Sequence, residues 1–483
     1  MDIIEQTELL PILRRLNPWW QSSVYQTNLP LRRSVFSQIS HLVINSPSKA
    51  NRAVIISGAR RVGKTTLLKQ LVESLIRDHK IDPNQILYLT MDYPLLKLAG
   101  LEQLLELYEN LISKRQDVPT YLLIDELQYI NEWQTRLKFF VDHVPKYHII
   151  ATGSAFSLRK GGTESGVGRW HLIKVPTLSF YEYLTLIGWP QLQLEVKKYL
   201  PVIFSSNGLV IKEIKSHTES LISAFNDYLL KGGFPEIAQI SDDNEAQKVL
   251  REDVVERVLK RDLTTVFGAR NVDDIERLFL YLCINQGCII NRRTVAEKLG
   301  ISTTSLVNYI SYLEDANLLY TLSPYKLGGK KALKKRNKYY LADSSLANAV
   351  FLRGKELFED NTALGMTVET TVFKHIFTQY YKNTPLFGYW YDATSKKEVD
   401  IIVNLPDEGL FPFEVKYRQS LRSSDIEGIL RFVEEEEPLR SYIITKDIDD
   451  FELFHYPKNN APILRIPAAI FCYLLGLAEI ESD

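Results

Sequence analysis

Cysteine is scarce in this chain of 483 residues, which contains only Cys283, Cys288 and Cys472. Three scattered cysteines cannot build a disulfide framework or a cysteine-rich zinc site, and they favour a reducing compartment. An excess of one charge is also lacking, because 58 Lys and Arg residues nearly balance 59 Asp and Glu residues, for a net charge of −1. A protein that is basic throughout is therefore excluded, and any nucleic-acid contact must come from a local patch.

Long apolar runs are missing as well. The longest, residues 468–478, is too short to span a bilayer and predicts a buried helix. The first residues, 1–5, lack the basic and then apolar layout of a signal peptide. These absences favour a cytoplasmic protein with no membrane partner. A composition of 45% hydrophobic and 24% charged residues is that of a globular protein, and 483 residues predict two to four domains.

A phosphate-binding loop is the strongest motif present. Residues 58–65 read Gly-Ala-Arg-Arg-Val-Gly-Lys-Thr, which fits G-x-x-x-x-G-K-[ST], directly after the apolar run 54–56. A strand is predicted to end there and a helix to begin near Thr65, so that backbone N–H groups and the helix dipole face a phosphate chain. Lys64 would reach the β- and γ-phosphates and Thr65 would hold Mg²⁺; the alternative is a structural glycine turn. The predicted ATP-binding residues are Gly58, Ala59, Arg60, Arg61, Val62, Gly63, Lys64, Thr65, Thr66 and Asp125.

A second apolar run, residues 121–126, ends in Asp125 and Glu126. Strand and helix patterns alternate from residue 52 onward, which predicts a mostly parallel α/β sheet. Asp125, at the carboxyl end of its strand, would hold the water shell of Mg²⁺. Glu126 would orient and deprotonate the attacking water, and it is a predicted catalytic residue together with Lys64.

Three further residues are candidates for the same site. Ser154 follows a predicted strand over 148–152, and both a contact with the γ-phosphate or the water and plain turn chemistry remain open for it. Arg159 and Arg169 flank a glycine-rich segment and are candidate arginine fingers, acting on their own or a neighbour's nucleotide. A surface or structural role is the alternative for each arginine.

Several segments together resemble a known family. They are residues 60–65, 123–128, Trp133, 152–154, and 168–169 leading to 178–182, with 17–20 and 232–235 in addition. This set resembles the bacterial and archaeal AAA-type ATPase family whose members carry a C-terminal domain of unknown function. The resemblance implies a helical extension over 1–50, a P-loop ATPase core over 51–190 and a helical lid or connector over 191–272. Assembly into a homo-oligomer is an expectation for this class.

Residues 273–341 predict a winged helix-turn-helix. Helical patterns over 274–286, 294–299 and 303–316, with a turn at Gly300, are followed by strands over 318–322 and 338–341. Ser302 would cap the last helix, and Leu306, Ile310 and Leu313 would form its inner stripe.

The predicted recognition helix, residues 302–317, contains no Lys or Arg, so Arg cannot read guanine there, although Asn308 could contact adenine. The stretch 326–338 between the two strands is basic, with Lys326, Lys330, Lys331, Lys334, Lys335, Arg336 and Lys338. Such a cluster predicts DNA as a partner, bound through its phosphates without sequence specificity. The alternative is a solvated loop on a protein-contact module.

The C-terminal part, residues 342–483, contains a second set of candidate site residues. Asp400 is on a predicted strand over 398–403, and Glu414 and Lys416 share one face of the next, over 410–416. Asp400 and Glu414 can bind one Mg²⁺, and Lys416 can position water or stabilise charge on phosphorus. The arrangement resembles the PD-(D/E)xK nuclease fold, with Glu369 as a catalytic acid from a helix and Val399 in place of the pattern's proline. The alternative is a relic in which Lys416 pairs with Asp400 or Glu414.

The sequence therefore predicts an α/β protein in which an AAA-type P-loop NTPase core precedes a winged helix-turn-helix and a restriction-endonuclease-like domain. The predicted activity is Mg²⁺-dependent ATP binding and hydrolysis on or near DNA, with a metal-dependent nuclease site. Two alternatives remain open: a nucleotide-driven switch whose C-terminal domains only bind DNA or a protein, and a protein-remodelling machine.

Overall fold

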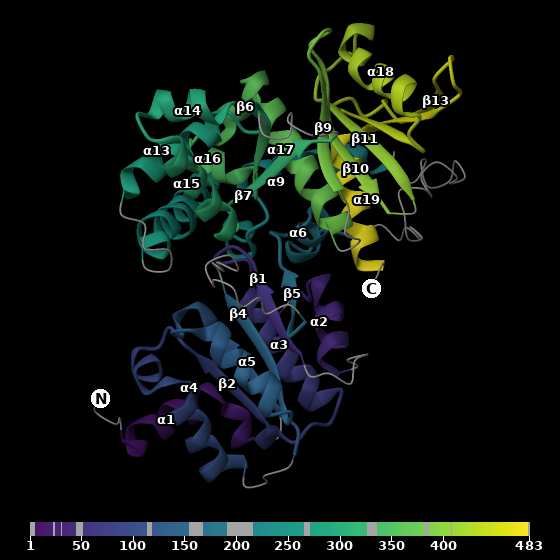
Figure 1. Ribbon diagram of the computed structural model, residues 1–483. Helices are drawn as coiled ribbons and strands as arrows, with labels where there is room; N and C mark the ends of the chain where they lie inside the picture. The colour runs from purple at the N-terminus through teal and green to yellow at the C-terminus, as the bar shows by residue number, and fades with distance from the viewer. Residues whose placement is uncertain are drawn as a thin grey trace. The chain divides into compact units, whose positions relative to one another are not determined.

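The computed structural model describes residues 5–22, 25–29, 31–44, 52–113, 118–153, 168–190, 216–264, 271–325, 336–381, 386–406 and 408–481. The chain divides into two compact units (Figure 1). The first comprises residues 1–176 with 265–268, and the second comprises residues 177–264 with 269–483.

The first unit is built on a sheet of five parallel strands in the order β2-β3-β4-β1-β5. The strands are β1 Ala53–Ser57, β2 Ile86–Thr90, β3 Thr120–Asp125, β4 Tyr147–Gly153 and β5 Trp170–Lys174. Strands β1 to β4 are almost wholly buried, as expected for a parallel sheet with helices on both faces. Because β4 lies between β1 and β3, any polar side chain at its end sits between the phosphate loop and Asp125.

Helices cover the two faces of this sheet according to the period-two alternation of its strands. Leu87, Leu122 and Ile149 pack with the helices α1 Gln6–Leu16, α4 Pro94–Tyr108 and α5 Trp133–His143. The helices α2 Val35–Ile44 and α3 Lys64–Arg77 also pack on the sheet. Residues one position along each strand, among them Tyr88 and Thr152, face away from the first group of helices.

The free edge of β2 is closed by the N-terminal segment. Asn17 accepts from the Tyr88 N–H at 2.7 Å and donates to the Tyr88 carbonyl at 3.0 Å. The indole N–H groups of Trp19 and Trp20 donate to the Ile86 carbonyl at 3.1 and 2.9 Å. The adjacent tryptophans therefore serve packing, and they cover backbone groups that an edge strand would otherwise expose.

The second unit contains a sheet of nine strands in the order β13-β14-β12-β11-β10-β9-β7-β8-β6. Their bounds are β6 Ile289–Ile290, β7 Leu319–Pro324, β8 Asn337–Leu341, β9 Leu386–Asp392, β10 Lys397–Leu405, β11 Gly409–Lys416, β12 Ser441–Thr445, β13 Glu452–His455 and β14 Pro462–Pro467. Pairs β7–β9, β11–β12 and β12–β14 are parallel, and the other pairs are antiparallel. The strands predicted for a winged helix therefore continue the sheet of the C-terminal part.

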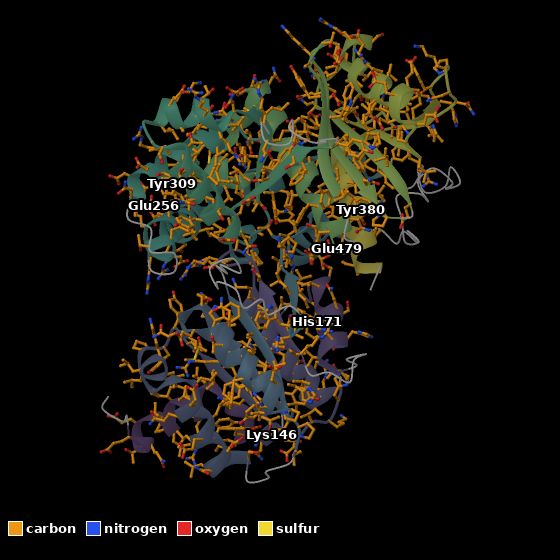
Figure 2. The ribbon with its side chains drawn as sticks, in the orientation of Figure 1. Lys146, His171, Glu256, Tyr309, Tyr380 and Glu479 are labelled. Atoms are coloured by element: carbon orange, nitrogen blue, oxygen red, sulfur yellow. The ribbon has the colours of Figure 1, made fainter. Side chains whose placement is uncertain are left out.

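The helices of this unit are α6 Phe180–Leu186, α9 Thr218–Lys231, α10 Pro235–Ala238, α11 Asp243–Leu250, α13 Val272–Ile284, α14 Arg292–Leu299, α15 Thr303–Asp315, α16 Ser345–Phe351, α17 Asn361–Tyr380, α18 Glu427–Glu436 and α19 Ala468–Glu481. Helix α17, with Tyr380 near its end, packs against α19, which bears Glu479 (Figure 2). Residues 468–479 are buried, which confirms the expected buried helix. Within the described residues, no helix has both the length and the apolar character needed to cross a membrane.

The helix-turn-helix region has the element order α13-β6-α14-α15-β7-β8. Gly300, between α14 and α15, has a φ of 68° in the left-handed region. The Ser302 hydroxyl accepts from the Ser305 N–H at 2.9 Å, and Leu306, Ile310 and Leu313 are buried, so the predicted cap and inner stripe are confirmed. Residues 326–335 of the basic stretch lie outside the described residues.

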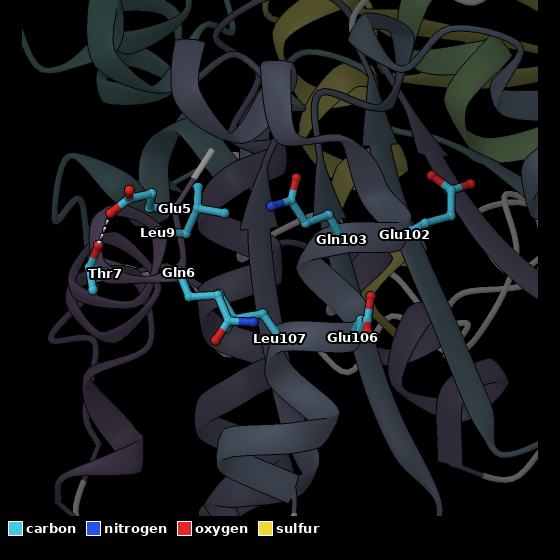
Figure 3. Close-up of a pocket in the computed structure, with 8 residues that line it drawn as sticks. All are labelled: Glu5, Gln6, Thr7, Leu9, Glu102, Gln103, Glu106 and Leu107. Atoms are coloured by element: carbon cyan, nitrogen blue, oxygen red, sulfur yellow. Dashed lines mark hydrogen bonds between the residues drawn. The ribbon is translucent and has the colours of Figure 1, made fainter. Parts of the chain in front are cut away.

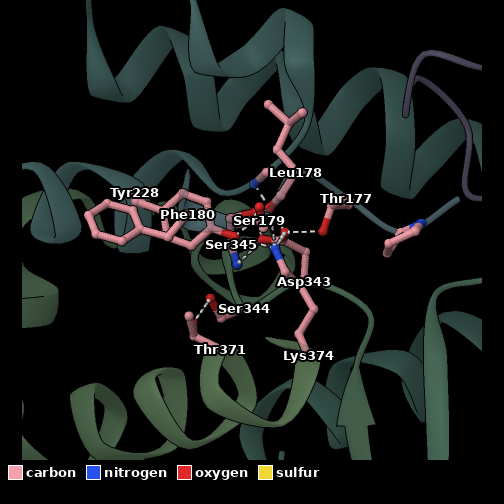
Figure 4. Close-up of polar contacts among 12 residues, drawn as sticks. Thr177, Leu178, Ser179, Phe180, Tyr228, Asp343, Ser344, Ser345, Thr371 and Lys374 are labelled. Atoms are coloured by element: carbon pink, nitrogen blue, oxygen red, sulfur yellow. Dashed lines mark hydrogen bonds and ion pairs between the residues drawn. The ribbon is translucent and has the colours of Figure 1, made fainter. Parts of the chain in front are cut away.

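A buried polar network begins the second unit (Figure 4). Asp343 accepts from the Thr177 hydroxyl at 2.6 Å, the Gly233 N–H at 3.0 Å and the Ser345 hydroxyl at 2.7 Å. The Lys374 ammonium lies 3.2 Å from Asp343 and donates to the Leu178 carbonyl at 2.7 Å. A Cβ on Gly233 would lie 2.4 Å from the Leu178 carbonyl oxygen, so this position requires glycine.

This network holds the segment that follows Pro176, where the first unit ends, and the end of the ATPase core predicted at residue 190 stays a prediction. Helix α6 packs on α9 and α19, where Phe180 contacts Phe225 and Tyr228. The segment after Pro176 is therefore held by the core of the second unit. The boundaries predicted at residues 272 and 341 stay predictions.

Candidate nucleotide-binding site

The phosphate loop connects the end of β1 at Ser57 to the start of α3 at Lys64, as the motif predicted. Its first glycine is required by a close approach, because a Cβ on Gly58 would lie 2.4 Å from the Val175 carbonyl oxygen. Its second, Gly63, has a φ of 96°, which side chains other than glycine rarely adopt. The loop therefore has the tight winding that turns backbone N–H groups inward.

Two basic side chains hold the loop from opposite directions. The Lys64 ammonium donates to the Gly58 and Ala59 carbonyls at 3.0 and 2.9 Å from within the loop. The buried Arg33 guanidinium donates through Nη1 to the Val62 carbonyl at 3.1 Å and through Nη2 to the Pro176 carbonyl at 3.0 Å. Arg33 thus ties the phosphate loop to the end of the segment that follows β5.

Asp125 is surrounded by hydroxyl groups. Its Oδ2 accepts from Thr65 Oγ1 at 2.7 Å and from the Tyr88 phenol at 2.9 Å, and its Oδ1 accepts from the Thr152 hydroxyl. Burial, and then the charge of Asp125, raises the pKa of Tyr88, so its phenol stays protonated and donates. Thr65 and Asp125 are therefore adjacent, as an Mg²⁺ site at a phosphate loop needs.

Glu126 directly follows Asp125, the last residue of β3, and its backbone leaves the strand conformation. Its φ of 59° is in the left-handed region, which is uncommon for a residue with a side chain and recurs at functional sites. Its N–H donates to Thr152 Oγ1 at 3.3 Å, and Gln128 donates to its carboxylate. Burial, with a contribution from Asp125, raises the pKa of Glu126 against the opposing effect of Lys64. A raised pKa makes this carboxylate a stronger base.

Among the other candidates, Ser154 and Arg159 lie outside the described residues. Arg169 directly precedes β5, and Trp170 lies opposite Ala53 at the start of β1, whereas the phosphate loop follows the end of β1. At about 3.3 Å per residue, a five-residue strand separates Arg169 from the loop by roughly 15 Å. Arg169 also forms an ion pair with Asp142 at 3.0 Å. This ion pair fits the predicted alternative of a structural role, and a role of Arg169 as an arginine finger stays a prediction.

The sequence reasoning missed Arg33, Tyr88 and Thr152 as parts of this site. Tyr88 and Thr152 occupy β2 and β4, the two neighbours of β3, and they lie on the strand face that includes Asp125. The alternation of side chains along a strand could have placed both residues on this face, but only once the order of the strands was known. For Arg33, which is distant in sequence from both of its acceptors, we find no sequence signal.

A separate cavity of about 650 Å³ lies between α1 and α4 in the first unit (Figure 3). It is lined by Glu5, Gln6, Thr7, Leu9, Glu102, Gln103, Glu106 and Leu107. No predicted nucleotide-binding residue is part of this lining.

The second unit brings together the residues predicted for a nuclease site. Glu369 on α17, Asp400 on β10 and Lys416 on β11 line one cavity of about 820 Å³ with Glu398, Arg418 and Lys446. Glu414 is buried beside Lys416, with which it forms an ion pair, and it is not part of the cavity lining. Across the described ranges, no three or more His, Cys, Asp or Glu side chains are arranged to hold a metal ion.

A lysine that was not predicted for this site occupies its centre. Lys338 Nζ lies 2.9 Å from Asp400 Oδ1, 3.3 Å from Glu369 Oε1 and 3.5 Å from Glu398 Oε1. The sequence placed Lys338 in the basic, DNA-contacting stretch 326–338; this is wrong, because its side chain is 1% exposed. Lys338 belongs to β8, whose five residues are all buried, and the basic run therefore ends before the strand begins.

The carboxylates of this site differ in their pKa values. Burial alone would raise the pKa of Asp400, but Lys338 and Lys416 hold it at about 2. Burial and then the charge of Asp400 raise the pKa of Glu369 to about 7 and that of Glu414 to about 8. Lys338 and Lys416 therefore keep Asp400 ionised, whereas Glu369 and Glu414 take up a proton at a higher pH than an exposed glutamate does.

Comparison with known proteins agrees with the geometry of the first unit. Residues 50–184 match the family described as "AAA domain". Residues 222–357 and 364–465 match two families described as domains of unknown function, DUF8612 and DUF4143. Together with the parallel sheet and the phosphate loop, the first match identifies an AAA-type P-loop domain, which is a nucleotide-binding fold.

Curated relatives span bacteria and archaea. An uncharacterised protein of Haemophilus influenzae is 25% identical over 74% of this chain and 80% of its own length. One of Methanocaldococcus jannaschii is 29% identical over 60% of each chain, and one of Mycobacterium tuberculosis is 23% identical over 75% of this chain and 70% of its own.

Solved structures give weaker likenesses. The Walker-type ATPase of Pyrococcus abyssi is 14% identical, with a TM-score of 0.35 over 68% of this chain and 99% of that one. The Aeropyrum pernix ORC1 protein in complex with DNA is 12% identical, with a TM-score of 0.30 over 69% of this chain and 95% of that one.

Proposed function

We propose that this protein is an Mg²⁺-dependent ATPase that acts on or near DNA. The observation that carries the proposal is the group of side chains at the phosphate loop. Thr65 Oγ1 lies 2.7 Å from Asp125 Oδ2, and the next residue, Glu126, has a raised pKa. This donor set fits the nucleotide and the metal ion, because a hydroxyl and a carboxylate are ligands that Mg²⁺ prefers.

Each residue has a distinct role in the proposed reaction. The backbone N–H groups of residues 58–66 bind the phosphates, and Lys64 leaves the Gly58 and Ala59 carbonyls to reach the β- and γ-phosphates. Thr65 would hold Mg²⁺, and Asp125 would hold its water shell. When bound, Mg²⁺ neutralises charge on the phosphate oxygens. Glu126 accepts a proton from the attacking water, and burial favours this transfer by making its carboxylate more basic.

For the second unit, we propose a winged helix-turn-helix that binds DNA. The order α13-β6-α14-α15-β7-β8, with β8 paired to both β6 and β7, supports this assignment. Thr304, Val307 and Asn308 of α15 are exposed, and Asn308 can contact adenine. Arg293 on α14 has an 84% exposed side chain, and the sequence adds the basic residues 326–336. These cations suit contacts with phosphate groups.

We propose further that this unit binds DNA and does not cut it. The predicted alternative of a nucleotide-driven switch is favoured by one specific observation, the ion pairs that engage Asp400 and Glu414. These pairs match the alternative in which the acids and lysines neutralise each other.

The test is ATP hydrolysis by the full chain with and without double-stranded DNA, with the DNA product run on a gel in Mg²⁺ and in Mn²⁺. We expect hydrolysis that DNA stimulates, that Lys64→Ala abolishes and that Lys69→Ala leaves intact, since Lys69 is an exposed residue of the same helix. We expect intact DNA in every lane. Hydrolysis that persists in Lys64→Ala would refute the nucleotide site. Hydrolysis that DNA does not change, but a protein client does, would refute the role on DNA.

A further inference from the structure

A group of acidic side chains in the second unit surrounds a buried lysine. Its members are Lys338 on β8, Glu369 on α17, and Glu398 and Asp400 on β10, and we call it the Lys338 cluster. Three carboxylates from two elements surround a single ammonium group at 2.9 to 3.5 Å. A buried ammonium with this environment takes the position that a divalent cation would need between the same oxygens.

Three carboxylate oxygen atoms of Asp400 and Glu369 already accept hydrogen bonds. Asp400 Oδ1 accepts from Lys338, and Asp400 Oδ2 accepts from the Val415 N–H at 2.9 Å. Glu369 Oε1 accepts from Lys338 at 3.3 Å and from the Tyr340 phenol at 2.7 Å. Replacing any of these donors by a metal ion would leave a buried donor without its acceptor, which is costly.

Glu414 is the one member of the predicted metal set with an unused oxygen. Its Oε2 has no hydrogen-bond partner among the described residues, while its Oε1 is paired with Lys416. Glu414 is 2% exposed and is absent from the lining of the cavity that contains Asp400. The two predicted metal ligands, Asp400 and Glu414, therefore do not offer their oxygen atoms to one common cavity.

Lys338 cannot move aside to admit a metal ion without breaking this group. Its strand, β8, lies inside the sheet between β7 and β6, and its side chain is 1% exposed. A metal ion bound to Asp400 Oδ1 at about 2.1 Å would meet the ammonium on the same oxygen, and the two cations would repel each other in a buried site. A lysine displaced within this core would be left as an unpaired buried charge.

We propose that Lys338 is the resident cation of this site, so that the second unit holds no divalent cation between Asp400 and Glu414 and lacks a metal-dependent cleavage centre. The cluster instead joins β8, α17 and β10. A direct consequence is that the metal site is latent: a neutral side chain at position 338 removes the ammonium group that Asp400, Glu369 and Glu398 surround, and a divalent ion can then bind in its place.

The experiment measures Mn²⁺ binding to the full chain, without nucleotide, by calorimetry and by the electron paramagnetic resonance signal of free Mn²⁺. Wild type, Asp400→Asn, Lys338→Met and the double variant Lys338→Met with Asp400→Asn are compared. Lys374→Met is the matched control, because Lys374 is also a buried lysine of this unit and pairs with Asp343. Circular dichroism establishes that each variant is folded.

We expect wild type, Asp400→Asn and Lys374→Met to bind the same amount of Mn²⁺. Lys338→Met should bind one additional ion per chain, and the double variant should lose it. A wild-type protein that binds one ion more than Asp400→Asn would overturn the proposal, and this comparison does not depend on whether Lys338→Met folds. A folded Lys338→Met without an additional ion would also overturn it. Since no nucleotide is present, these outcomes are independent of the proposed ATPase activity.

Discussion

Replacing Thr152 by valine removes one hydroxyl group from the nucleotide site and keeps the shape of the side chain. That hydroxyl donates to Asp125 Oδ1 and accepts from the Glu126 N–H at 3.3 Å, so a single group positions both acidic residues. Thr152 lies at the end of β4, between the strand of the phosphate loop and the strand of the two acids. Its loss should disturb the alignment of metal ion and base rather than the contacts to the nucleotide.

The size of the effect follows from the two hydrogen bonds. A bond to a charged carboxylate contributes about 1.5–3 kcal/mol and a bond between neutral groups about 0.5–1.5 kcal/mol. If both act mainly in the transition state, their loss raises the barrier by roughly 2–4 kcal/mol. With about 1.4 kcal/mol per factor of ten, kcat should fall by about 30-fold to 1,000-fold.

The assay is steady-state ATP hydrolysis at saturating Mg²⁺ and ATP, together with the Kd for a fluorescent ATP analogue. We expect a large fall in kcat for Thr152→Val and a Kd within about threefold of wild type, as for an interaction made chiefly in the transition state. Thr152→Ser keeps the hydroxyl and should retain most of the activity. A folded Thr152→Val with nearly wild-type kcat would refute the reasoning, as would equal losses in the valine and serine variants.

Three further outcomes follow from contacts in the two units. Tyr88→Phe removes one hydrogen-bond donor from Asp125. Since a hydrogen bond contributes about 1 kcal/mol, the Mg²⁺ concentration for half-maximal hydrolysis should rise about fivefold. An unchanged Mg²⁺ titration would contradict this prediction. Lys374→Met leaves Asp343 as a buried charge without its ion pair, so the free energy of unfolding in urea should fall by about 3–5 kcal/mol. A fall below about 1 kcal/mol would show that the ion pair contributes little to stability. Burial, and then Lys374, lowers the pKa of His375 to about 3, whereas an unfolded histidine titrates near 6.5. Because the unfolded chain binds the proton first, His375 should reduce stability by up to about 1.4 kcal/mol per pH unit as the pH falls from about 6.5 to about 3. His375→Gln, measured by urea unfolding across this window, should lack that part of the slope, and an identical slope would refute the assignment.

The phosphate loop was predictable because its chemistry is local. Gly58, Gly63, Lys64 and Thr65 fall within eight consecutive residues, and the structure gives each glycine a local reason: a close approach to Val175 in one case and a positive φ in the other. A motif that depends on the backbone angles of neighbouring residues can be recognised from consecutive residues of the sequence. Arg33, Tyr88 and Thr152 reach the same site through strand order and tertiary contacts, which consecutive letters do not contain.

For Lys338, a local sequence pattern gave a wrong prediction of its location. It ends a run rich in lysine and arginine, so composition placed it on the surface. The residues after it, Tyr339, Tyr340 and Leu341, continue a buried strand, and Tyr340 donates to Glu369 from the same face of β8. The period of two from Tyr340 back to Lys338 was therefore present in the sequence. What was absent was any sign that β8 lies beside α17 and β10.

Two buried aspartates, Asp125 and Asp400, differ in the groups that donate hydrogen bonds to them, and this difference underlies our two proposals about metal binding. Both lie on strands, and both accept hydrogen bonds through each carboxylate oxygen. The donors to Asp125 described above are the hydroxyls of Thr65, Tyr88 and Thr152, which orient a carboxylate without cancelling its charge. The donor to Asp400 Oδ1 is an ammonium group, which supplies the positive charge that the carboxylate needs. The chemistry of the partner, more than the presence of the acid, is therefore the reason why we propose an Mg²⁺ site at Asp125 and none at Asp400.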